Sequence, residues 1–471
     1  MHKPAATRPN EILERTIMNM NRKLIVAAVV TSALSCTTAL AAVSADEAAT
    51  LGTTLTPLGA EKAGNAGGTI PAWTGGLTTP QPGFKTGGHY PDPYSADKSL
   101  FTIDASNMEK YKANLSPGQL ALLKRYPSWK MKVYPTRRSA GYPQGIYDET
   151  IANATKVKLV DPGVGFTGTS GGTPFPIPKN GLEVIWNHIT SYKGDTYRTS
   201  WSQAPVTAGG DYNLVSFDYE YDFVYSNQNK KPSEREPNLL FYFLQLIKQP
   251  PRLAGSVLLV HEFADQVTQP RKAWSYNPGQ RRVRLAPNVS YDNPGTAADG
   301  LRTNDDFFMY NGATDRYDWK LVGKREMYVP YNGYVINGPT IKIKDVLQPG
   351  HVNGEHARYE LHRMWEIEAN LKSGTSHLYK KRVFFVDEDS WIVLVQDKYD
   401  NRNQLWRVDE QHTSQYYDVP FLGPGLEVKH DLQSGRYIAL SIRNEETKVY
   451  DRVPLTPADF TPDALRSKGT R

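Results

Sequence analysis

One run of the sequence has the spacing of a hydrolytic nucleophile. Residues 168–172, GTSGG, match the G-x-S-x-G pattern, in which Ser170 would attack a carbonyl carbon. That chemistry requires a strand before the serine and a helix directly after it. Pro174 and Pro176 follow closely after Ser170 and disfavour a helix at this place. The sequence therefore favours a loop at Ser170 over a catalytic turn.

His261, Glu262 and Asp265 form one compact group of side chains that can donate and accept protons. Such groups mark active sites when burial or charge shifts their pKa values. A hydrogen-bonded set at the end of a strand explains the same grouping equally well. We expect no catalytic centre, and a hydrolase built around Ser170 or His261 stays an alternative. His188, which stands alone in a predicted helix, is expected to be a core or surface residue.

The residue types that bind metals are scattered along the sequence. The ten histidines form no H-x-x-x-H pair, and the one cysteine, Cys36, lies near the N-terminus. Residues 397–403, DKYDNRN, are similar to a calcium-binding loop, but the glycine at the sixth position and the glutamate at the twelfth are missing. We expect a turn there and no metal. No phosphate-binding or dinucleotide-binding pattern is present, so no cofactor is expected.

The N-terminal 41 residues predict export. Arg22 and Lys23 precede an apolar run at 24–33, and the small residues 39–41, ALA, provide a cleavage site near Ala41. Residues 1–19 are interpreted as an upstream extension. An alternative is a lipid anchor on Cys36, although the leucine usual three residues before such a cysteine is missing. No later stretch approaches about 20 apolar residues, so no transmembrane segment is expected in the mature, periplasmic chain.

The composition of the chain restricts the remaining classes of function and fold. The net charge of +6 falls to +3 without residues 1–41, which gives no support for nucleic-acid binding. The chain contains 28 tyrosines and nine tryptophans but few helix-forming runs. Aromatic residues are enriched in strands, so the composition favours a β-rich protein.

The stretch from Tyr379 to Arg407 has the strongest strand pattern. Two apolar runs, 383–386 and 391–395, flank the turn residues 387–390, DEDS, and predict a hairpin. Successive residues of a strand point to opposite faces, so these strands are apolar on both faces. Each face therefore requires protein core or an apolar ligand against it. Similar patterns predict strands at 198–202, 213–226, 239–247, 257–263, 271–287, 358–371, 405–412, 426–431 and 436–442.

Helices and loops are predicted from their boundary residues. Ser116 and Gln119 form a capping box before an apolar stripe, and Asn180 caps a helix at 180–192. A short helix or helix-loop is expected at 296–309, and a loop at 317–334. We divide the chain into 1–41, extension and signal peptide; 42–100, an extended arm rich in Gly and Pro; 101–178, a helical and loop segment; 179–450, the sheet domain; and 451–471, a polar tail.

Four segments together resemble one family. They are PFPIPKNGLEVIWNH (174–188), QPPRLAGSVLLVHE (249–262), RKAWSYNPGQRRVRLAP (271–287) and RVFFVDEDSWIVLVQDKYDNRNQLWR (382–407). The chain is similar through them to the exported bacterial "domain of unknown function 1329" family. The resemblance implies a β-rich α+β fold: a large curved antiparallel sheet, an open half-barrel like that of the lipoprotein carriers LolA and LolB, wrapped around helices. It also implies partners, namely an inner-membrane exporter of the resistance-nodulation-division class and an outer-membrane protein.

These observations lead to the hypothesis of a periplasmic, non-catalytic carrier of a lipid or other hydrophobic molecule. The ligand would lie on the concave face of the half-barrel, with an arginine at the rim for an anionic head group. A scaffold subunit of an envelope transport assembly without its own ligand is the alternative. The candidate ligand-binding residues are Trp274, Tyr276, Arg282, Arg284, Phe384, Val386, Trp391, Val393 and Trp406.

Overall fold

The computed structural model describes residues 43–160, 163–286, 289 and 291–469. The predicted leader, its cleavage site and Cys36 lie outside the described residues. The chain divides into two units, Met1–Val43 and Ser44–Arg471, and the second unit contains every element described below.

One 15-stranded sheet organises the second unit. All neighbouring strands are antiparallel except β2 and β12, and the two end strands, β1 and β10, do not pair, so the sheet stays open. The order of neighbours is β1 (Phe101–Ile103), β2 (Met131–Val133), β12 (Tyr359–Leu371), β13 (Lys381–Asp387), β14 (Val393–Tyr399), β15 (Leu405–Tyr416), β16 (Phe421–Asp431), β17 (Tyr437–Ile442), β5 (Thr196–Val206), β6 (Val215–Asp222), β7 (Leu239–Gln249), β8 (Val257–Phe263), β9 (Lys272–Asn277) and β10 (Arg282–Leu285). β11 (Tyr317–Pro330) pairs with β12, and β3 (Lys158–Leu159) pairs with β4 (Phe166–Thr167) in a separate small sheet.

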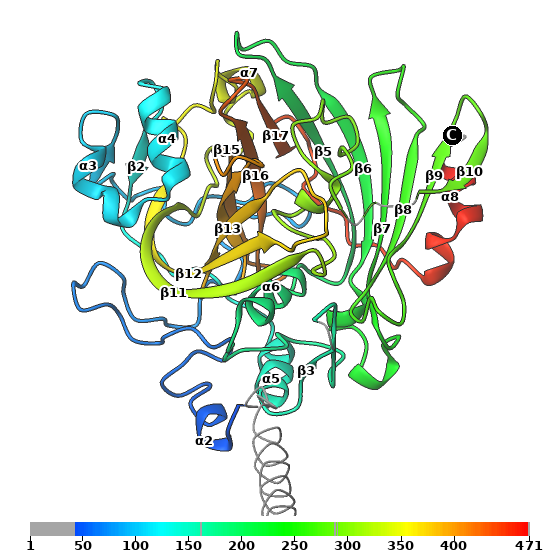
Figure 1. The fold of residues 1–471 in the computed structure, drawn as a ribbon, viewed down its shortest axis with the longest axis horizontal. Coiled ribbons are helices and arrows are strands. Elements are labelled where there is room, and N and C mark those ends of the chain that lie inside the picture. Colours follow the sequence, from blue (N-terminus) through cyan, green and yellow to red (C-terminus); the bar gives the residue numbers. More distant parts are fainter. Residues whose placement is uncertain (1–42, 161–162, 287–288, 290, 470–471) are drawn as a thin grey trace, which may run out of the picture. The chain divides into compact units, whose positions relative to one another are not determined.

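Figure 1 shows the large sheet curving from β12 through β17 to β9, with α6 on its inner side. The predicted β-rich class and open curved sheet are confirmed. The helices are short: α2 (Ala45–Ala48), α3 (Met108–Tyr111), α4 (Pro117–Arg125), α5 (Gln144–Asn153), α6 (Gly181–Ile189), α7 (Ile343–Val346) and α8 (Pro462–Gly469).

The two predicted helix starts are confirmed. Ser116 Oγ accepts the N–H of Gln119 at 3.0 Å, and Gln119 Oε1 accepts the N–H of Ser116 at 3.1 Å, which closes the capping box of α4. Asn180 Oδ1 accepts the N–H of Glu183 at 3.0 Å at the start of α6. All but one of the residues of α6 are buried, because the helix contacts β11 and β12 and is enclosed by the sheet.

Residues 291–316, here called the plug segment, connect β10 to β11 and reach into the curve of the sheet. Within the plug segment, Asp306 makes two buried ion pairs. Arg382 Nη2 of β13 lies 2.5 Å from Asp306 Oδ1, and Lys398 Nζ of β14 lies 2.8 Å from Asp306 Oδ2. Asp305 Oδ2 lies 2.7 Å from Arg382 Nη1. All four side chains are buried. Burial opposes ionisation, but Lys398 and Arg382 outweigh it and hold the pKa of Asp306 well below its usual value.

The ion pairs continue across the next two strands. Lys398 Nζ lies 2.6 Å from Asp409 Oδ2 on β15, and Lys429 Nζ on β16 lies 3.0 Å from the same oxygen. Lys429 also pairs with Glu427 at 3.3 Å. The inner face of the central strands is therefore charged, and its charges are matched by neighbouring strands and by the plug segment.

The plug segment also covers the apolar inner face of β6 and β7. Phe307 packs against Phe243 with ring centroids 5.2 Å apart, and Phe308 packs against Tyr221 at 6.1 Å. A cavity of only about 40 Å³ remains between this part of the plug and β7 and β8. The inside of the half-barrel is thus filled by the protein itself.

Two predictions concern this region. Of the short helix or helix-loop expected at 296–309, the structure has a loop with a 3-10 turn at Asn304–Asp306, and no α-helix forms because Ala297, Asp299 and Phe308 have left-handed backbones with φ of 50°, 55° and 51°. The loop expected at 317–334 was wrong, since this segment is mostly the 14-residue strand β11. A bulge lies between Leu321 and Gly323, and the residues after it, 323–326 (GKRE), interrupt the run of apolar residues that identifies a strand in a sequence.

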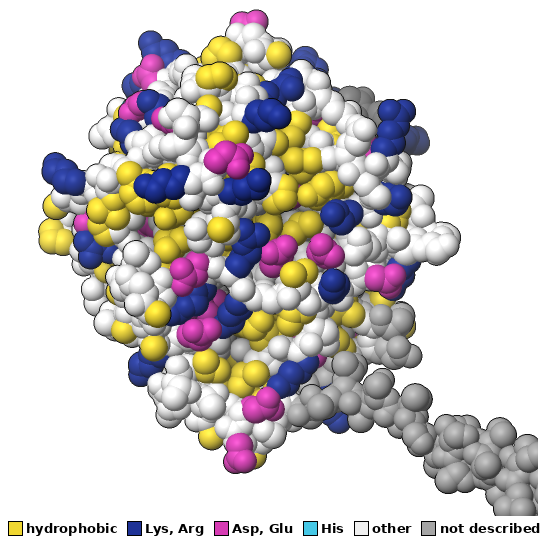
Figure 2. Space-filling model, turned by 60° about the vertical axis from the view of Figure 1, so that its left-hand side comes forward, with side chains coloured by type: hydrophobic (Ala, Val, Ile, Leu, Met, Phe, Trp, Pro, Cys, Tyr) yellow, Lys and Arg dark blue, Asp and Glu magenta, His cyan; other side chains and the backbone are white. Residues whose placement is uncertain are grey.

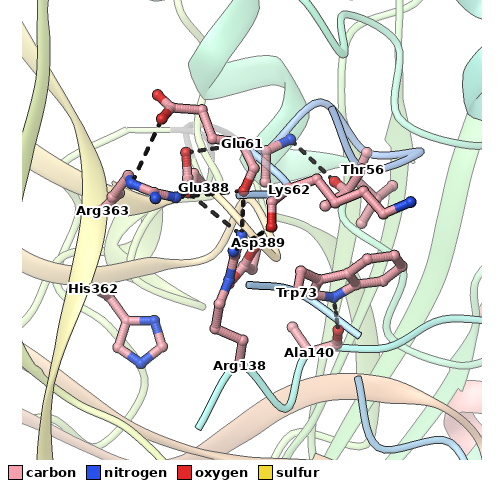
Figure 3. Close-up of polar contacts among 12 residues, drawn as sticks. Thr56, Glu61, Lys62, Trp73, Arg138, Ala140, His362, Arg363, Glu388 and Asp389 are labelled. Carbon is pink, nitrogen blue, oxygen red and sulfur yellow. Dashed lines mark hydrogen bonds and ion pairs between the residues drawn. The ribbon is translucent and has the colours of Figure 1, made fainter. Parts of the chain in front are cut away.

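The arm at 49–100 is irregular chain fixed to the sheet domain by two arginines (Figure 3). Arg138 Nη2 donates to Glu61 O at 2.7 Å, and Arg363 Nη2 donates to Ala63 O at 2.7 Å. Trp73 Nε1 donates to Ala140 O at 3.2 Å and so also anchors the arm. At the other end of the chain, α8 contacts β8, β9 and β10.

The substitution Asp306→Asn tests the plug contacts. It removes one buried negative charge while keeping the size of the side chain, so Lys398 and Arg382 lose an ionic partner. Breaking a buried pair in this way costs about 3–5 kcal/mol. We expect the free energy of unfolding in urea to fall by about that amount.

Asp299→Asn is the matched control, since Asp299 lies in the same plug segment but is paired with Arg436 at the surface, where its side chain is 67% exposed. Surface pairs contribute about 0–1 kcal/mol. Equal losses in the two variants would contradict a special role for the buried pair.

Candidate functional site

The predicted alternatives for catalysis do not form a site. Ser170 Oγ donates to Pro232 O at 3.2 Å in a loop with no helix after it, as the sequence indicated. His261 Nε2 lies 2.8 Å from Phe460 O. Glu262 follows His261 in β8 and so points to the opposite face, where it pairs with Arg271. Asp265 accepts the N–H groups of a turn.

His188 has a structural role at the end of α6. Its Nδ1 lies 3.1 Å from Trp391 O and its Nε2 lies 2.9 Å from Phe308 O, so the ring joins the helix to the β13–β14 turn and to the plug segment. Burial lowers the pKa of His188 to about 3. The ring therefore stays neutral and serves as a hydrogen-bonding core residue, which is one of the two roles that we predicted.

Among the described residues, His362, Asp387 and Asp389 are close enough to share a metal ion, with one ligand atom of each within 4.8 Å of the others. Arg138 occupies both carboxylate oxygens of Asp389, at 2.6 and 2.9 Å. Figure 3 shows this guanidinium between Asp389 and the arm. A bidentate arginine competes directly with a cation, so the cluster is better explained as an ion-pair network that fixes the arm.

The turn predicted at residues 397–403 is confirmed in its second half. Asp400 Oδ1 accepts the N–H groups of Arg402 and Gln404, both at 2.9 Å. Asp397 instead belongs to β14, where it accepts the N–H of Gly118 in the first turn of α4 at 2.8 Å.

The predicted ligand-binding residues lie in separate places. Phe384, Val386, Trp391 and Val393 are fully buried, and Phe384 packs against Tyr310 of the plug segment. The others are distributed over the sheet edge and β15: Trp274 and Trp406 are partly exposed, Tyr276 is buried, and Arg282 and Arg284 are exposed on β10. The structure does not bring them together, and their contact with a ligand stays a prediction.

A partly open pocket of about 300 Å³ lies where β16 and β5 separate. We call it the seam pocket. β17 ends at Ile442, opposite Ser202, so the first half of β5 has only the single bridge between Arg198 and Asp451 on that side. The pocket is lined by Gly194, Asp195, Thr196, Tyr197, Thr199, Asn229, Tyr416, Val419, Phe421, Pro424, Arg443, Val449, Tyr450, Arg452, Val453 and Pro454.

Aromatic rings form the walls of the seam pocket. Tyr416 and Phe421 are stacked with centroids 4.7 Å apart, and Tyr197 lies 6.4 Å from Tyr450. Tyr90 of the arm supports Tyr416 from behind at 4.8 Å. Such contacts keep the pocket open, because stacked rings hold one another in fixed positions.

Two arginines and one aspartate line the seam pocket. Arg443 is 6% exposed, and its Nη1 donates to Tyr416 Oη at 3.0 Å and to Pro424 O at 3.1 Å. Arg452 is paired with Asp418 at 3.2 Å. Burial raises the pKa of Asp195, which accepts hydrogen bonds from Gln228 N and Asn229 Nδ2 at 2.7 and 3.1 Å.

A larger hollow of about 650 Å³ lies over β5, β6 and β7 beside the C-terminal helix. Its lining includes charged side chains of both signs, and several of them pair with one another, as Lys248 and Asp218 do at 2.8 Å. On the face in Figure 2, charged side chains of both signs are interspersed with hydrophobic ones. Of the two hollows, the seam pocket has the larger share of apolar lining and fewer charged side chains.

No sequence signal identified the seam pocket. Tyr197, Tyr416 and Tyr450 belong to segments far apart in the chain, and Arg443 follows a strand without any motif around it. Within the described residues, no helix has the length and hydropathy needed to cross a membrane.

These features define a class: a β-rich domain with an open, curved sheet around a buried helix. The family model named "Protein of unknown function (DUF1329)" matches residues 102–466. The chain belongs to this family, as its resemblance indicated. A curated relative, uncharacterized protein PA3922 of Pseudomonas aeruginosa, is 51% identical over 456 residues, which are 96% of this chain and 100% of that protein.

Solved structures are similar to about 60% of the chain. A putative outer membrane lipoprotein-sorting protein domain from Vibrio parahaemolyticus is 14% identical with a TM-score of 0.42, covering 61% of this chain and 98% of that one. A DUF1329 family protein from Desulfovibrio piger is 16% identical with a TM-score of 0.39, covering 58% and 92%. A LolA superfamily protein from Nitrosomonas europaea is 12% identical with a TM-score of 0.36, covering 61% and 100%.

A buried carboxyl group outside the pocket gives a pH-dependent prediction. Burial raises the pKa of Glu410 from 4.5 to about 7, while Gln119 and Tyr359 donate to it at 3.0 and 2.9 Å. Between these two pH values the folded protein binds a proton that the unfolded chain lacks, so this group makes stability fall as pH rises. The variant Glu410→Gln should therefore gain stability over the wild type from pH 4.5 to 7, by up to about 3 kcal/mol, in urea unfolding.

The control is Glu355→Gln. Glu355 is a surface carboxylate whose pKa is lowered to about 2 by hydrogen bonds from Lys130 and Lys132. The contribution of Glu355 to the free energy of unfolding changes only near pH 2 to 4.5. The difference in the free energy of unfolding between this variant and the wild type should therefore be constant from pH 5 upward. A flat difference for Glu410→Gln as well would show that its carboxyl group is ionised throughout.

Proposed function

We propose that this chain is a periplasmic carrier that binds one hydrophobic molecule or acyl chain in the seam pocket without altering it chemically. The observation that carries the proposal is a pocket of about 300 Å³ with aromatic and aliphatic walls. Small-molecule pockets have volumes of about 300–1,000 Å³ and are mostly apolar with a few polar groups. Burial of an acyl chain contributes about 0.8 kcal/mol per methylene before ordering costs are subtracted.

The position of the pocket differs from the one expected for a half-barrel. The concave face is occupied by the plug segment, whereas the seam pocket lies at the end of that face beside the loop after α6. A ligand can enter there while the ion pairs of Asp305 and Asp306 stay intact.

A ligand-free scaffold is the second candidate function. The observation in its favour is the filled interior, where Phe307 and Phe308 cover the apolar face of β6 and β7. In either function we propose an inner-membrane exporter and an outer-membrane protein as partners, on the strength of the family resemblance alone.

The carrier function is tested by filling the pocket. Val453 is a half-buried pocket residue, and Val453→Trp adds a bulky ring to the cavity. We expect binding of the fluorescent probe N-phenyl-1-naphthylamine to weaken by at least about tenfold, because one lost pocket contact of 1.4 kcal/mol corresponds to tenfold. Fluorescence titration measures the affinity.

Val322→Trp is the control, since Val322 is 47% exposed at the bulge of β11 and lies outside the pocket. It should bind the probe like the wild type. If the probe and native mass spectrometry of the gently purified protein both show no bound hydrophobic molecule, the carrier function fails and the scaffold function is favoured.

A further inference from the structure

Arg443 is buried in the seam pocket without an ionic partner. Its two hydrogen bonds both use Nη1 and end on neutral oxygens, those of Tyr416 and Pro424. Its Nε is buried and has no hydrogen-bond partner among the described residues. The edge of the guanidinium formed by Nε and Nη2 therefore makes no hydrogen bond within the described part of the chain. This edge is one of those that pair bidentately with carboxylates.

The other buried arginines behave differently. Eight arginines are buried in the described residues, and six of them have a carboxylate oxygen within 4.0 Å: Arg138, Arg235, Arg358, Arg363, Arg382 and Arg407. Arg302 is the second exception and does not line the seam pocket. Removing a cation from water without a partner costs several kcal/mol, so this protein pairs its buried arginines almost everywhere else.

The remaining charges of the pocket do not compensate Arg443. Arg452 is paired with Asp418, whose carboxylate also accepts the hydroxyl protons of Tyr90 and Tyr450. Asp195 has its own donors in Gln228 and Asn229 and lies beyond ion-pair distance of Arg443. Among the described residues, Arg443 therefore has no carboxylate oxygen within 4.0 Å, and Glu446 acts on it only over a longer distance.

We propose that the seam pocket binds a single-chain amphiphile with a carboxylate head, whose head pairs with Arg443 from the Nη2 side, because Nε itself is shielded from solvent. The tail lies along Tyr197, Phe421 and Val449. This assignment deepens the carrier function proposed above and rests on it.

Size and charge select this occupant. A pocket of about 300 Å³ lies at the lower end of the range of about 300–1,000 Å³ that small-molecule sites occupy. It therefore suits a single chain better than the two chains of a phospholipid. A cation without a carboxylate within 4.0 Å matches a monoanion, so a carboxylate fits better than a phosphate that carries two charges.

Isothermal titration calorimetry with decanoate and decanol at pH 7.5 tests the proposal. The two molecules have the same chain, and they differ in the charged head. We expect the wild type to bind decanoate at least about tenfold more tightly than decanol, since hydrogen bonds to charged groups are the strong ones. Arg443→Met should reduce decanoate affinity to the level of decanol and leave decanol affinity unchanged.

Three further variants control the result. Arg443→Lys keeps the positive charge but not the planar fork, so it should retain an intermediate preference for decanoate. Arg402→Gln removes an exposed guanidinium in the turn before β15 and should bind both molecules like the wild type. Arg282→Gln tests the rival head-group position on β10 that the sequence predicted. Thermal unfolding followed by circular dichroism shows whether each variant is folded. If Arg443→Met is not folded, the wild-type comparison and the lysine variant decide.

The outcomes separate this inference from the function on which it rests. Equal binding of decanoate and decanol by the wild type overturns the carboxylate assignment and leaves the carrier function standing. Loss of the preference in Arg282→Gln, but not in Arg443→Met, also overturns it and moves the head group to the sheet edge. Failure of both molecules to bind overturns the carrier function as well.

Discussion

The ion pairs between the plug segment and the inner face of the sheet are the contacts on which the rest of the structure depends. Asp305 and Asp306 neutralise Arg382 and Lys398 inside the curve of the sheet, where water cannot do so. The alternation of charges on β13–β16 requires a partner of opposite sign, and the plug provides it. The consequence is a half-barrel whose interior is filled with its own chain, so any binding space must lie elsewhere.

The seam pocket follows from the lengths of two strands. β17 has six residues and β5 has eleven, so β5 continues past the end of its neighbour. The segment after β17 returns to Arg198 through a single bridge with Asp451 and does not complete the sheet. Aromatic side chains from β15, β16 and the C-terminal segment then line the gap. The difference in length between β17 and β5 thereby produces the seam pocket without interrupting the hydrogen bonds between paired strands.

Much of this fold could be predicted from the sequence, and the reasons for the failures are physical. Strands with regular apolar patterns and helices with side-chain caps, such as those at Ser116 and Asn180, were found because their signals are local. β11 was missed because the polar run 323–326, GKRE, follows its bulge and interrupts the apolar pattern. The sequence showed that the strands around Phe384 are apolar on both faces, but it could not show that Tyr310 packs against Phe384. Arg443 has no local signal at all, since its isolation depends on which segments surround it.

The energies of the buried ion pairs and of tail burial explain why binding of a ligand on the concave face is unfavourable in this protein. To admit a tail there, the plug segment must leave. Arg382 then loses its pairs with Asp305 and Asp306, and Lys398 loses its pair with Asp306 and keeps only Asp409. Breaking a buried pair costs about 3–5 kcal/mol, and two such losses cost roughly twice as much. A chain of about ten methylenes contributes about 8 kcal/mol on burial, from which ordering costs are still to be subtracted. Exchange of plug for tail therefore gives no net stabilisation. The seam pocket already exists with the plug in place, so the whole burial energy of the tail remains available for binding.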